Sequence, residues 1–291
     1  MALEDGDLPA VLHALGLPGL IDVHTHFMPP AILAKVWAYF DSAGPLLGRA
    51  WPIRYRGSDD ERVEQLRAMG VRRFSALSYA HRPGIATFMN DWTAEFADRV
   101  PDSLRSATFY PEPEAATYVP ELIADGVEVF KVHVQVGNFA PNDPLLDPVW
   151  EALAASGTPI VLHAGSGPTP GDHTGPSKVA DVLSRHPGLA LVIAHLGMPE
   201  IAEFLDLAEQ HEQVRLDTTM AFVDFWGPPT HTDVVPRLRD LQDKILFGTD
   251  FPNIPYPYVH QVEALQRLDL GDDWMRSVLW HNGSELFGVS G

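Results

Sequence analysis

Short apolar segments recur along the chain and alternate with longer amphipathic ones. Several of the apolar segments are nearly continuous in Val, Ile and Leu; they are Leu20 to Val23, Phe74 to Leu77, Ala107 to Tyr110, Val127 to Val134, Pro159 to Leu162, Leu189 to Ala194, Val214 to Leu216 and Ile245 to Phe247. Continuous apolar runs of this length are typical of strands that are buried on both faces of a parallel sheet. The pattern therefore predicts eight buried strands.

The amphipathic segments have apolar residues at helical spacing, as Val63, Leu66 and Met69 do. We expect helices over 59–69, 85–100, 113–124, 144–155, 177–185, 199–210 and 233–243, with glycine or proline at most of their ends. Strands that alternate with helices favour parallel β/α units, and eight such units close a barrel. The predicted fold class is therefore α/β, a (β/α)₈ TIM barrel. An open doubly wound sheet is the alternative, which is weakened because no Gly-x-Gly-x-x-Gly follows an early strand.

The 291 residues are predicted to form a single barrel domain, since barrels of this length commonly fold as one domain. We expect a short N-terminal cap over 1–19, a barrel core over 20–252, an inserted helix and loop over 27–57, and a C-terminal helical tail over 253–291. Insertions that follow barrel strands lie over the active face. The inserted segment and the tail are therefore candidate walls of a substrate pocket.

Composition narrows the classes of function. The formal net charge is -19, which disfavours binding to nucleic acid or to anionic membranes. No apolar run approaches the ~20 residues of a membrane span, and the acidic N-terminus has no basic start of a secretory signal. The chain has no cysteine, which removes thiolate nucleophiles and cysteine-based zinc sites. We expect a cytoplasmic protein that acts on a small-molecule substrate; association into a homo-oligomer stays open.

Histidine and aspartate stand at the ends of the predicted strands. Strand one ends in His24 and His26, strand five in His163, strand six in His195 and strand eight in Asp250. Strand four carries Lys131 and His133. The carboxyl ends of all barrel strands meet on one face, where catalytic groups collect. This placement predicts an active site at that face.

The spacing of these residues is that of a catalytic metal site. His24 and His26 are two residues apart, so on a strand they point the same way and can bind one ion. Imidazole and carboxylate suit Zn²⁺, and also Mn²⁺ or Fe²⁺. His163 and Asp250 complete three histidines and one carboxylate, with a position left for water. Each residue alone is more typical of a hydrogen-bonded structural group, and only the joint placement favours a metal.

Four motifs resemble those of a known family. They are Ile21-Asp-Val-His-Thr-His-Phe, Pro159-Ile-Val-Leu-His-Ala-Gly, Val192-Ile-Ala-His-Leu-Gly and Ile245-Leu-Phe-Gly-Thr-Asp-Phe-Pro. Together they resemble the amidohydrolase superfamily, and more narrowly the amidohydrolase-2 group, which includes enzymes similar to aminocarboxymuconate-semialdehyde decarboxylase. The resemblance implies one divalent metal, with Zn²⁺ as the first choice. It implies that His24, His26, His163 and Asp250 are ligands, that His195 lies beside the water the metal activates, and that Asp250 takes that water's proton.

The resemblance also raises the question of a second metal. Some members of the superfamily bind two metals through a carboxylated lysine on strand four, where Lys131 lies. We expect a single metal, with Lys131 and His133 contacting the substrate. Arg54 and Arg82, in loops after strands one and two, are candidate partners of a substrate carboxylate. Solvent exposure or pairing with acidic side chains is the alternative for each arginine.

The chemistry implied by the resemblance leaves the reaction open. We predict a metal-dependent hydrolase that acts on an ester, lactone or amide of a small organic substrate, which could be carboxylated or aromatic, because Phe130-Lys-Val-His and Ala164-Gly-Ser-Gly-Pro resemble the hydrolase branch. The alternative is a metal-dependent non-oxidative decarboxylase (carboxy-lyase) of an aromatic or unsaturated acid, whose opening motif is like Asp22-Val-His-Thr-His-Phe-Met-Pro. A non-catalytic metal-binding barrel is the third hypothesis, since fold alone does not fix function.

Overall fold

The computed structural model describes residues 3–227 and 231–289. The chain is α/β, and the strand pairs within each part of it are parallel. It divides into two compact units. The terminal unit comprises Met1–Phe74 and Thr218–Gly291, and the central unit comprises Ser75–Asp217.

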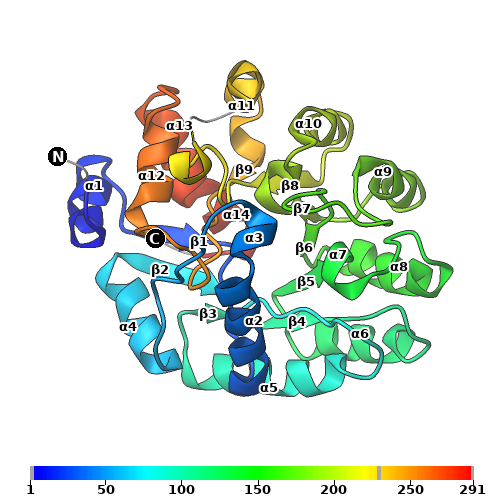
Figure 1. The fold of residues 1–291 in the computed structure, drawn as a ribbon. Coiled ribbons are helices and arrows are strands. Elements are labelled where there is room, and N and C mark those ends of the chain that lie inside the picture. Colours follow the sequence, from blue (N-terminus) through cyan, green and yellow to red (C-terminus); the bar gives the residue numbers. More distant parts are fainter. Residues whose placement is uncertain (1–2, 228–230, 290–291) are drawn as a thin grey trace. The chain divides into compact units, whose positions relative to one another are not determined.

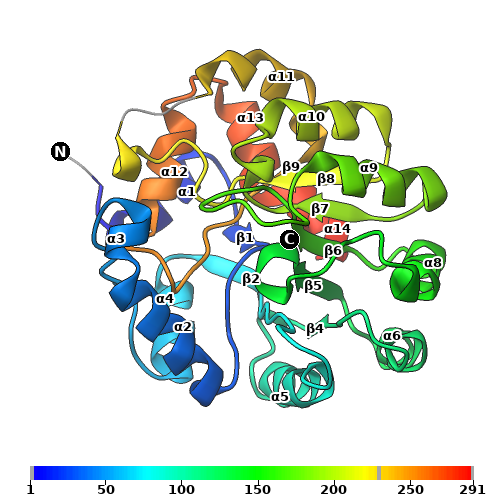
Figure 2. The ribbon, with the colours of Figure 1, turned by 45° about the vertical axis from the view of Figure 1, so that its right-hand side comes forward.

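The central unit contains a series of parallel strands. After the short β3 (Ser103–Leu104) come β4 (Ser106–Thr108), β5 (Val129–His133), β6 (Ile160–His163), β7 (Leu191–Ile193) and β8 (Val214–Asp217). Strands β4 to β8 pair in chain order, and Figure 2 shows them side by side in that order. Nearly all of their side chains are buried, as the continuous apolar runs predict.

Helices lie outside the strands of the central unit (Figure 1). They are α5 (Ala86–Arg99), α6 (Ala115–Ala124), α8 (Asp147–Ser156), α9 (Pro176–Arg185) and α10 (Ile201–Gln210), with the shorter α7 (Val134–Gly137), η2 (Pro144–Leu146) and η3 (Ala194–Gly197). Each long helix buries its apolar face, as α9 does with Val179, Val182 and Leu183. The predicted β/α alternation is confirmed here.

The terminal unit is formed by an N-terminal and a C-terminal part of the chain. Its strands are β1 (Leu20–Asp22), β2 (Val71–Ser75) and β9 (Ile245–Leu246), and β1 pairs with β2 in parallel. Its N-terminal helices are η1 (Asp5–Asp7), α1 (Leu8–Ala14), α2 (Pro30–Ser42), α3 (Gly44–Leu47) and α4 (Asp59–Ala68). The later ones are η4 (Asp224–Trp226), η5 (Thr232–Val234), α11 (Val235–Asp240), η6 (Gln242–Lys244), α12 (Val259–Gln266), α13 (Asp272–Arg276), the π-helix η7 (Ser277–His281) and α14 (Asn282–Phe287).

The inserted segment of the terminal unit packs against the start of the C-terminal tail. The indole N–H groups of Trp37 and Trp51 donate to Asn253, at 3.1 Å to its side-chain oxygen and 2.6 Å to its carbonyl. The Arg54 N–H donates to the Ile254 carbonyl at 3.0 Å. The two segments predicted as pocket walls are therefore in direct contact with each other.

Two details of the predicted fold were wrong. The strand predicted over 74–77 is β2, which runs over Val71–Ser75. Residues 74–77 are all buried, but the strand ends at Ser75. The apolar run therefore continues into the buried loop after the strand. The inserted segment over 27–57 was expected to contain one helix, and the structure has two, α2 and α3.

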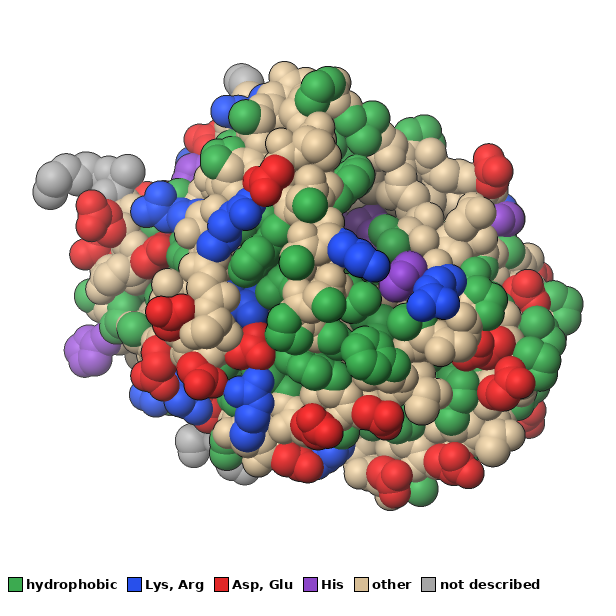
Figure 3. Space-filling model, turned by 60° about the horizontal axis from the view of Figure 1, so that its bottom comes forward, with side chains coloured by type: hydrophobic (Ala, Val, Ile, Leu, Met, Phe, Trp, Pro, Cys, Tyr) green, Lys and Arg blue, Asp and Glu red, His purple; other side chains and the backbone are tan. Residues whose placement is uncertain are grey.

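The acidic side chains are dispersed on the surface. On the face drawn in Figure 3, Asp and Glu lie singly or in small groups, with Lys and Arg among them. Some are ion-paired, as Asp41 is with Arg56 and Asp147 with Arg185. The large net charge therefore does not mark a single acidic patch on this face. Within the described residues, no helix is both long and apolar enough to span a bilayer.

Asn90 provides a test of how α5 is held on the strands. Its side-chain amide donates to the Thr108 carbonyl at 2.9 Å, and its side-chain oxygen accepts the Thr108 N–H at 2.8 Å. Asn90→Ala removes both buried hydrogen bonds, so we expect the free energy of unfolding to fall by about 2–4 kcal/mol. Denaturant titration measures this.

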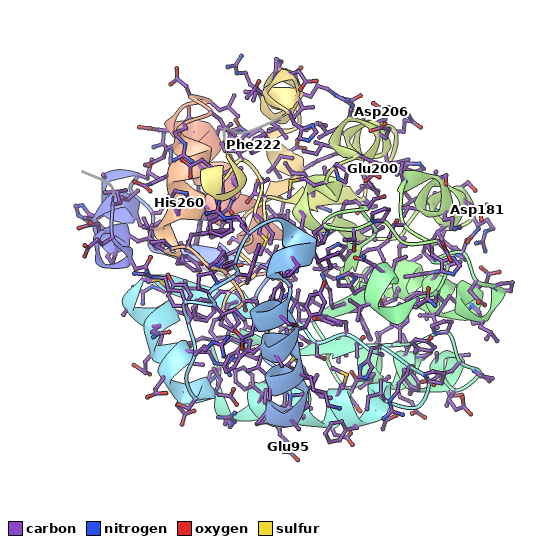
Figure 4. The ribbon with its side chains drawn as sticks, in the orientation of Figure 1. Glu95, Asp181, Glu200, Asp206, Phe222 and His260 are labelled. Atoms are coloured by element: carbon purple, nitrogen blue, oxygen red, sulfur yellow. The ribbon has the colours of Figure 1, made fainter. Side chains whose placement is uncertain are left out.

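Glu95 offers a matched control on the same helix. Its side chain is exposed and projects outward in Figure 4. Glu95→Ala should change the free energy of unfolding by less than about 0.5 kcal/mol. Equal losses in the two variants would contradict the role given to Asn90.

Candidate metal centre

A buried carboxylate lies at the end of β1. Asp22 Oδ1 accepts the N–H of His24 at 3.1 Å, and Oδ2 accepts the hydroxyls of Thr249 at 2.6 Å and Tyr258 at 2.7 Å. A buried charge is tolerated when it is well hydrogen-bonded, and this carboxylate accepts these hydrogen bonds from both sides of the unit's chain, at His24 and after β9. Asp22 therefore fixes the backbone at His24 and also the segment that follows β9.

Tyrosines extend this network toward the N-terminus. Burial, followed by the charge of Asp22, raises the pKa of Tyr258 well above its usual value, so its hydroxyl stays a donor. The Tyr258 N–H donates to the Tyr55 hydroxyl at 2.5 Å, and Tyr55 donates to Asp5 Oδ2 at 2.5 Å. Burial and the hydrogen bond to Asp5 raise the pKa of Tyr55 as well. The N-terminal cap is thus connected to the end of β1 through buried tyrosines.

His24, His26 and Asp250 converge. Their segments are tied through the backbone: Asp250 N–H donates to the His24 carbonyl at 2.9 Å, and His26 N–H donates to the Phe251 carbonyl at 2.7 Å. Asp250 Oδ1 lies 2.7 Å from His26 Nε2 and 3.4 Å from His24 Nε2. The histidine side chains are 1% and 6% exposed and that of Asp250 is 13% exposed. Two imidazoles and one carboxylate are thus collected at one nearly buried point.

Two of the separations among these three side chains can be compared with those around a bound divalent cation. Ligand atoms at about 2.0–2.1 Å from one tetrahedral Zn²⁺ lie roughly 3.3 Å from one another. The separation of Asp250 Oδ1 from His24 Nε2 already has this value, and the separation from His26 Nε2 is a hydrogen bond that must widen. Nitrogen and carboxylate oxygen are also the donors that such ions take.

Three histidines lie together in the central unit. The register of β5 and β6 places His133 beside His163, and their rings stack at 3.8 Å with an interplanar angle of 11°. The His195 ring lies 4.7 Å from that of His163. His195 has a left-handed backbone with φ of 57°, and its N–H donates to Asp217 Oδ1 at 2.9 Å. A carboxylate at the end of β8 thus fixes the turn that carries His195.

The loops after β6 and β7 hold one another in place. Nε2 of His163 lies 3.2 Å from the Gly167 carbonyl, and the Gly167 N–H donates to the Met198 carbonyl at 3.1 Å. Ser166 N–H donates to Glu200 Oε2, at 3.0 Å; Glu200 is labelled in Figure 4. A Cβ at Gly165 would lie only 2.4 Å from the Met198 carbonyl oxygen, so glycine is required at this close approach.

The remaining predicted residues lie in different surroundings. Lys131 is fully buried on β5. Arg82 is exposed before α5. Arg54 is exposed and lines a shallow pocket with Leu3, Glu4, Asp5, Gly6 and Pro257. Substrate contacts by these residues and by His133 stay predictions.

Sequence reasoning missed the carboxylates and tyrosines that position the histidines. Asp22 belongs to the motif that contains His24, so its place in the sequence was a usable signal. Asp217 is the last residue of its strand, as Asp22 is of β1, and this parallel was visible in the sequence. Tyr258 gave no such signal, because it lies 236 residues from the carboxylate to which it donates.

Comparisons with known proteins found a matching family model and similar solved structures. A family model described as amidohydrolase matches residues 21–289, and no curated protein matches the sequence. An uncharacterized TIM-barrel protein from Bordetella bronchiseptica is 20% identical with a TM-score of 0.75, covering 92% of this chain and 99% of that chain.

Two further solved structures carry named activities. A 5-carboxyvanillate decarboxylase from Novosphingobium aromaticivorans, complexed with manganese and 4-hydroxy-3-methoxy-5-nitrobenzoic acid, is 14% identical with a TM-score of 0.61, covering 93% of this chain and 96% of that one. A probable 2-pyrone-4,6-dicarboxylic acid hydrolase from Acinetobacter baumannii, with citric acid bound, is 16% identical with a TM-score of 0.58, covering 93% and 99%. At these identities the likeness shows the fold, and the predicted TIM-barrel class is confirmed.

Asp22→Asn tests the positioning role of this carboxylate. The substitution removes the charge and one acceptor oxygen that now serve three donors. Loss of a group that orients metal ligands typically costs about 10–100-fold in metal affinity, and we expect a loss in this range for Zn²⁺. Competition with a chromophoric chelator measures it.

Asp41→Asn is the control, because Asp41 is an exposed carboxylate of the same unit that pairs with Arg56. It should leave the Zn²⁺ affinity unchanged. An Asp22→Asn variant with wild-type affinity would show that Asp22 does not orient the metal ligands.

Proposed function

Because the chain belongs to the amidohydrolase family, we propose that it is a metal-dependent hydrolase that adds water to an ester, lactone or amide of a small organic substrate. The observation that carries the proposal is the convergence of His24 and His26 on Asp250 Oδ1 in a nearly buried position. Two imidazoles and one carboxylate that are nearly buried support a catalytic metal site. An ion pair with only a surface role would be exposed to solvent.

We propose one divalent ion held by His24, His26, His163 and Asp250. The geometry within the terminal unit supports His24, His26 and Asp250. His163 is proposed as the fourth ligand from its place in the sequence, at the end of the predicted strand five. Zn²⁺ is the first choice for imidazole and carboxylate ligands. Mn²⁺ is the main alternative, because manganese is bound in the similar 5-carboxyvanillate decarboxylase.

The protein's own residues would divide the chemical work. A divalent metal, when bound, lowers the pKa of water toward about 7 and polarises a carbonyl oxygen. The carboxylate of Asp250 takes the proton of the attacking water and returns it to the leaving group. The imidazole of His195, held by the Asp217 hydrogen bond to its backbone, donates to the oxygen that gains negative charge.

Decarboxylation is the second candidate. The fold is shared with a 5-carboxyvanillate decarboxylase, and the same set of groups could serve that reaction. His195 would then deliver a proton to the carbon that loses carbon dioxide. The two reactions differ in their products, so product analysis separates them.

The first test is a panel of γ- and δ-lactones, aryl esters and hydroxybenzoic acids, incubated with protein that has been loaded with Zn²⁺ or Mn²⁺. We expect acid release from at least one lactone or ester, followed with a pH indicator, and no carbon dioxide from the hydroxybenzoic acids. Carbon dioxide release without acid release would reverse the order of the two candidates.

The second test is Asp250→Asn. An amide cannot accept and return the proton, so kcat should fall by about 10²–10⁴-fold while the circular dichroism spectrum is kept. Asp98→Asn, at an exposed partner of Arg105, is the control and should keep the wild-type rate. A rate for Asp250→Asn close to that of this control would exclude Asp250 as the proton carrier.

A further inference from the structure

Two buried tyrosines follow Asp250 in the same segment, and their hydroxyls differ in how they are paired. Tyr258 donates to Asp22 Oδ2 at 2.7 Å. Tyr256 is 4% exposed, and its hydroxyl has no hydrogen-bond partner among the residues that the structure describes. Burying an unpaired hydroxyl is unfavourable, so such groups are rare and call for an explanation. A ligand that supplies the missing partner is one.

The charge of Asp250 affects the pKa of the Tyr256 hydroxyl. Burial raises its pKa well above the usual value, and the charge of Asp250 is the next cause. The hydroxyl therefore keeps its proton and can donate it to an acceptor. A buried hydrogen-bond donor in the segment that follows the proposed metal ligand suits an oxygen atom of a bound molecule.

The Tyr256 ring is held without help from its hydroxyl. Phe225 lies against it at 5.8 Å between ring centroids, and His260, labelled in Figure 4, lies at 5.5 Å. His260 is fixed in turn by Asp224, whose Oδ1 lies 2.5 Å from Nε2. Phe225 also meets Trp51 edge to face at 5.6 Å. Packing thus orients the ring, and the hydroxyl has no structural task among these contacts.

We propose that the Tyr256 hydroxyl is a substrate-binding group that donates a hydrogen bond to a carbonyl or carboxylate oxygen of the molecule bound at Asp250. The inference rests on the proposed function, because it needs a substrate at that carboxylate. It adds a specificity element: the substrate carries an acceptor oxygen within reach of Tyr256, and an analogue without that oxygen leaves the hydroxyl unpaired and binds more weakly.

The burial of the Tyr256 hydroxyl means that a ligand reaches it only through a local rearrangement. The Tyr256 hydroxyl is inaccessible in the free protein, so binding must displace a side chain that covers it. Phe225 contacts the ring and stands on a segment in which Met220 and Phe222 both have left-handed backbone, with φ of 57° and 63°. Such conformations are unfavourable for residues other than glycine, so an alternative arrangement of this segment is accessible at reduced cost.

The test compares Tyr256→Phe with Tyr258→Phe, a matched pair two residues apart. The probe is acetohydroxamate, a small ligand with two acceptor oxygens, titrated calorimetrically into the Zn²⁺-loaded protein. We expect Tyr256→Phe to keep the metal content, to unfold thermally at the wild-type temperature or above it, and to bind acetohydroxamate about tenfold more weakly. Tyr258→Phe should unfold at a lower temperature, because it loses the hydrogen bond to Asp22.

Two results would overturn the proposal. One is a Tyr256→Phe variant that is destabilised as much as Tyr258→Phe, which would give the hydroxyl a structural partner. The other is unchanged affinity for acetohydroxamate. The binding readout does not depend on which bond the enzyme cleaves, so a failure to hydrolyse lactones would contradict the proposed function and leave the result for Tyr256 standing.

Discussion

The buried carboxylate of Asp22 is the constraint on which the arrangement of His24 and Asp250 in the terminal unit depends. It accepts hydrogen bonds from residues that are as close as His24 and as distant as Thr249 and Tyr258. A charge in this environment is stable only while its donors stay in place, so the carboxylate fixes them as much as they solvate it. Through Asp22, the end of β1 and the segment after β9 are held at one spacing, and His24 reaches Asp250 as a result.

In the central unit, too, a buried carboxylate at the end of a strand accepts the backbone N–H of a histidine. Asp217 ends β8 and accepts the N–H of His195, which keeps that residue in a left-handed conformation. Carboxylates that position histidines are thus distinct from Asp250, the carboxylate proposed to react. The distinction is visible in burial: Asp22 and Asp217 are fully buried, whereas the Asp250 side chain keeps some exposure. A proton carrier needs access to water and substrate, and a positioning group does not.

The sequence predicted much of this arrangement, for identifiable reasons. Strands β4 to β8 lie within the predicted apolar runs or extend at most a residue or so beyond them, because buried parallel strands leave no polar alternation to confuse the pattern. His24 and His26 lie just beyond the end of β1, and Asp250 lies beyond the end of β9, so the strand alternation from which they were paired does not extend to them. Their role as metal ligands stays a prediction. The boundaries of β2 were missed because the buried loop after the strand continues the apolar run. The second inserted helix was missed because α3 has only four residues and none of them is buried, so it leaves no amphipathic pattern.

The hydrogen-bond network was beyond reach for a different reason. Tyr55, Tyr258 and Asp5 come from three distant segments, and no local pattern relates them. The lack of a partner for the Tyr256 hydroxyl among the described residues is likewise a property of the folded structure and leaves no mark in the sequence. Spacing along the chain predicts which groups face a site, but the pairing of each polar atom is a property of the folded whole.

The most direct measurement of the central claim is the metal stoichiometry of the purified protein, determined by mass spectrometry after dialysis against buffer with Zn²⁺ or Mn²⁺. One catalytic site predicts about one equivalent per chain, reduced strongly in a His24→Ala variant and unchanged in Asp98→Asn. Less than ~0.3 equivalents of any divalent metal in the wild-type protein, or full occupancy in His24→Ala, would contradict the account.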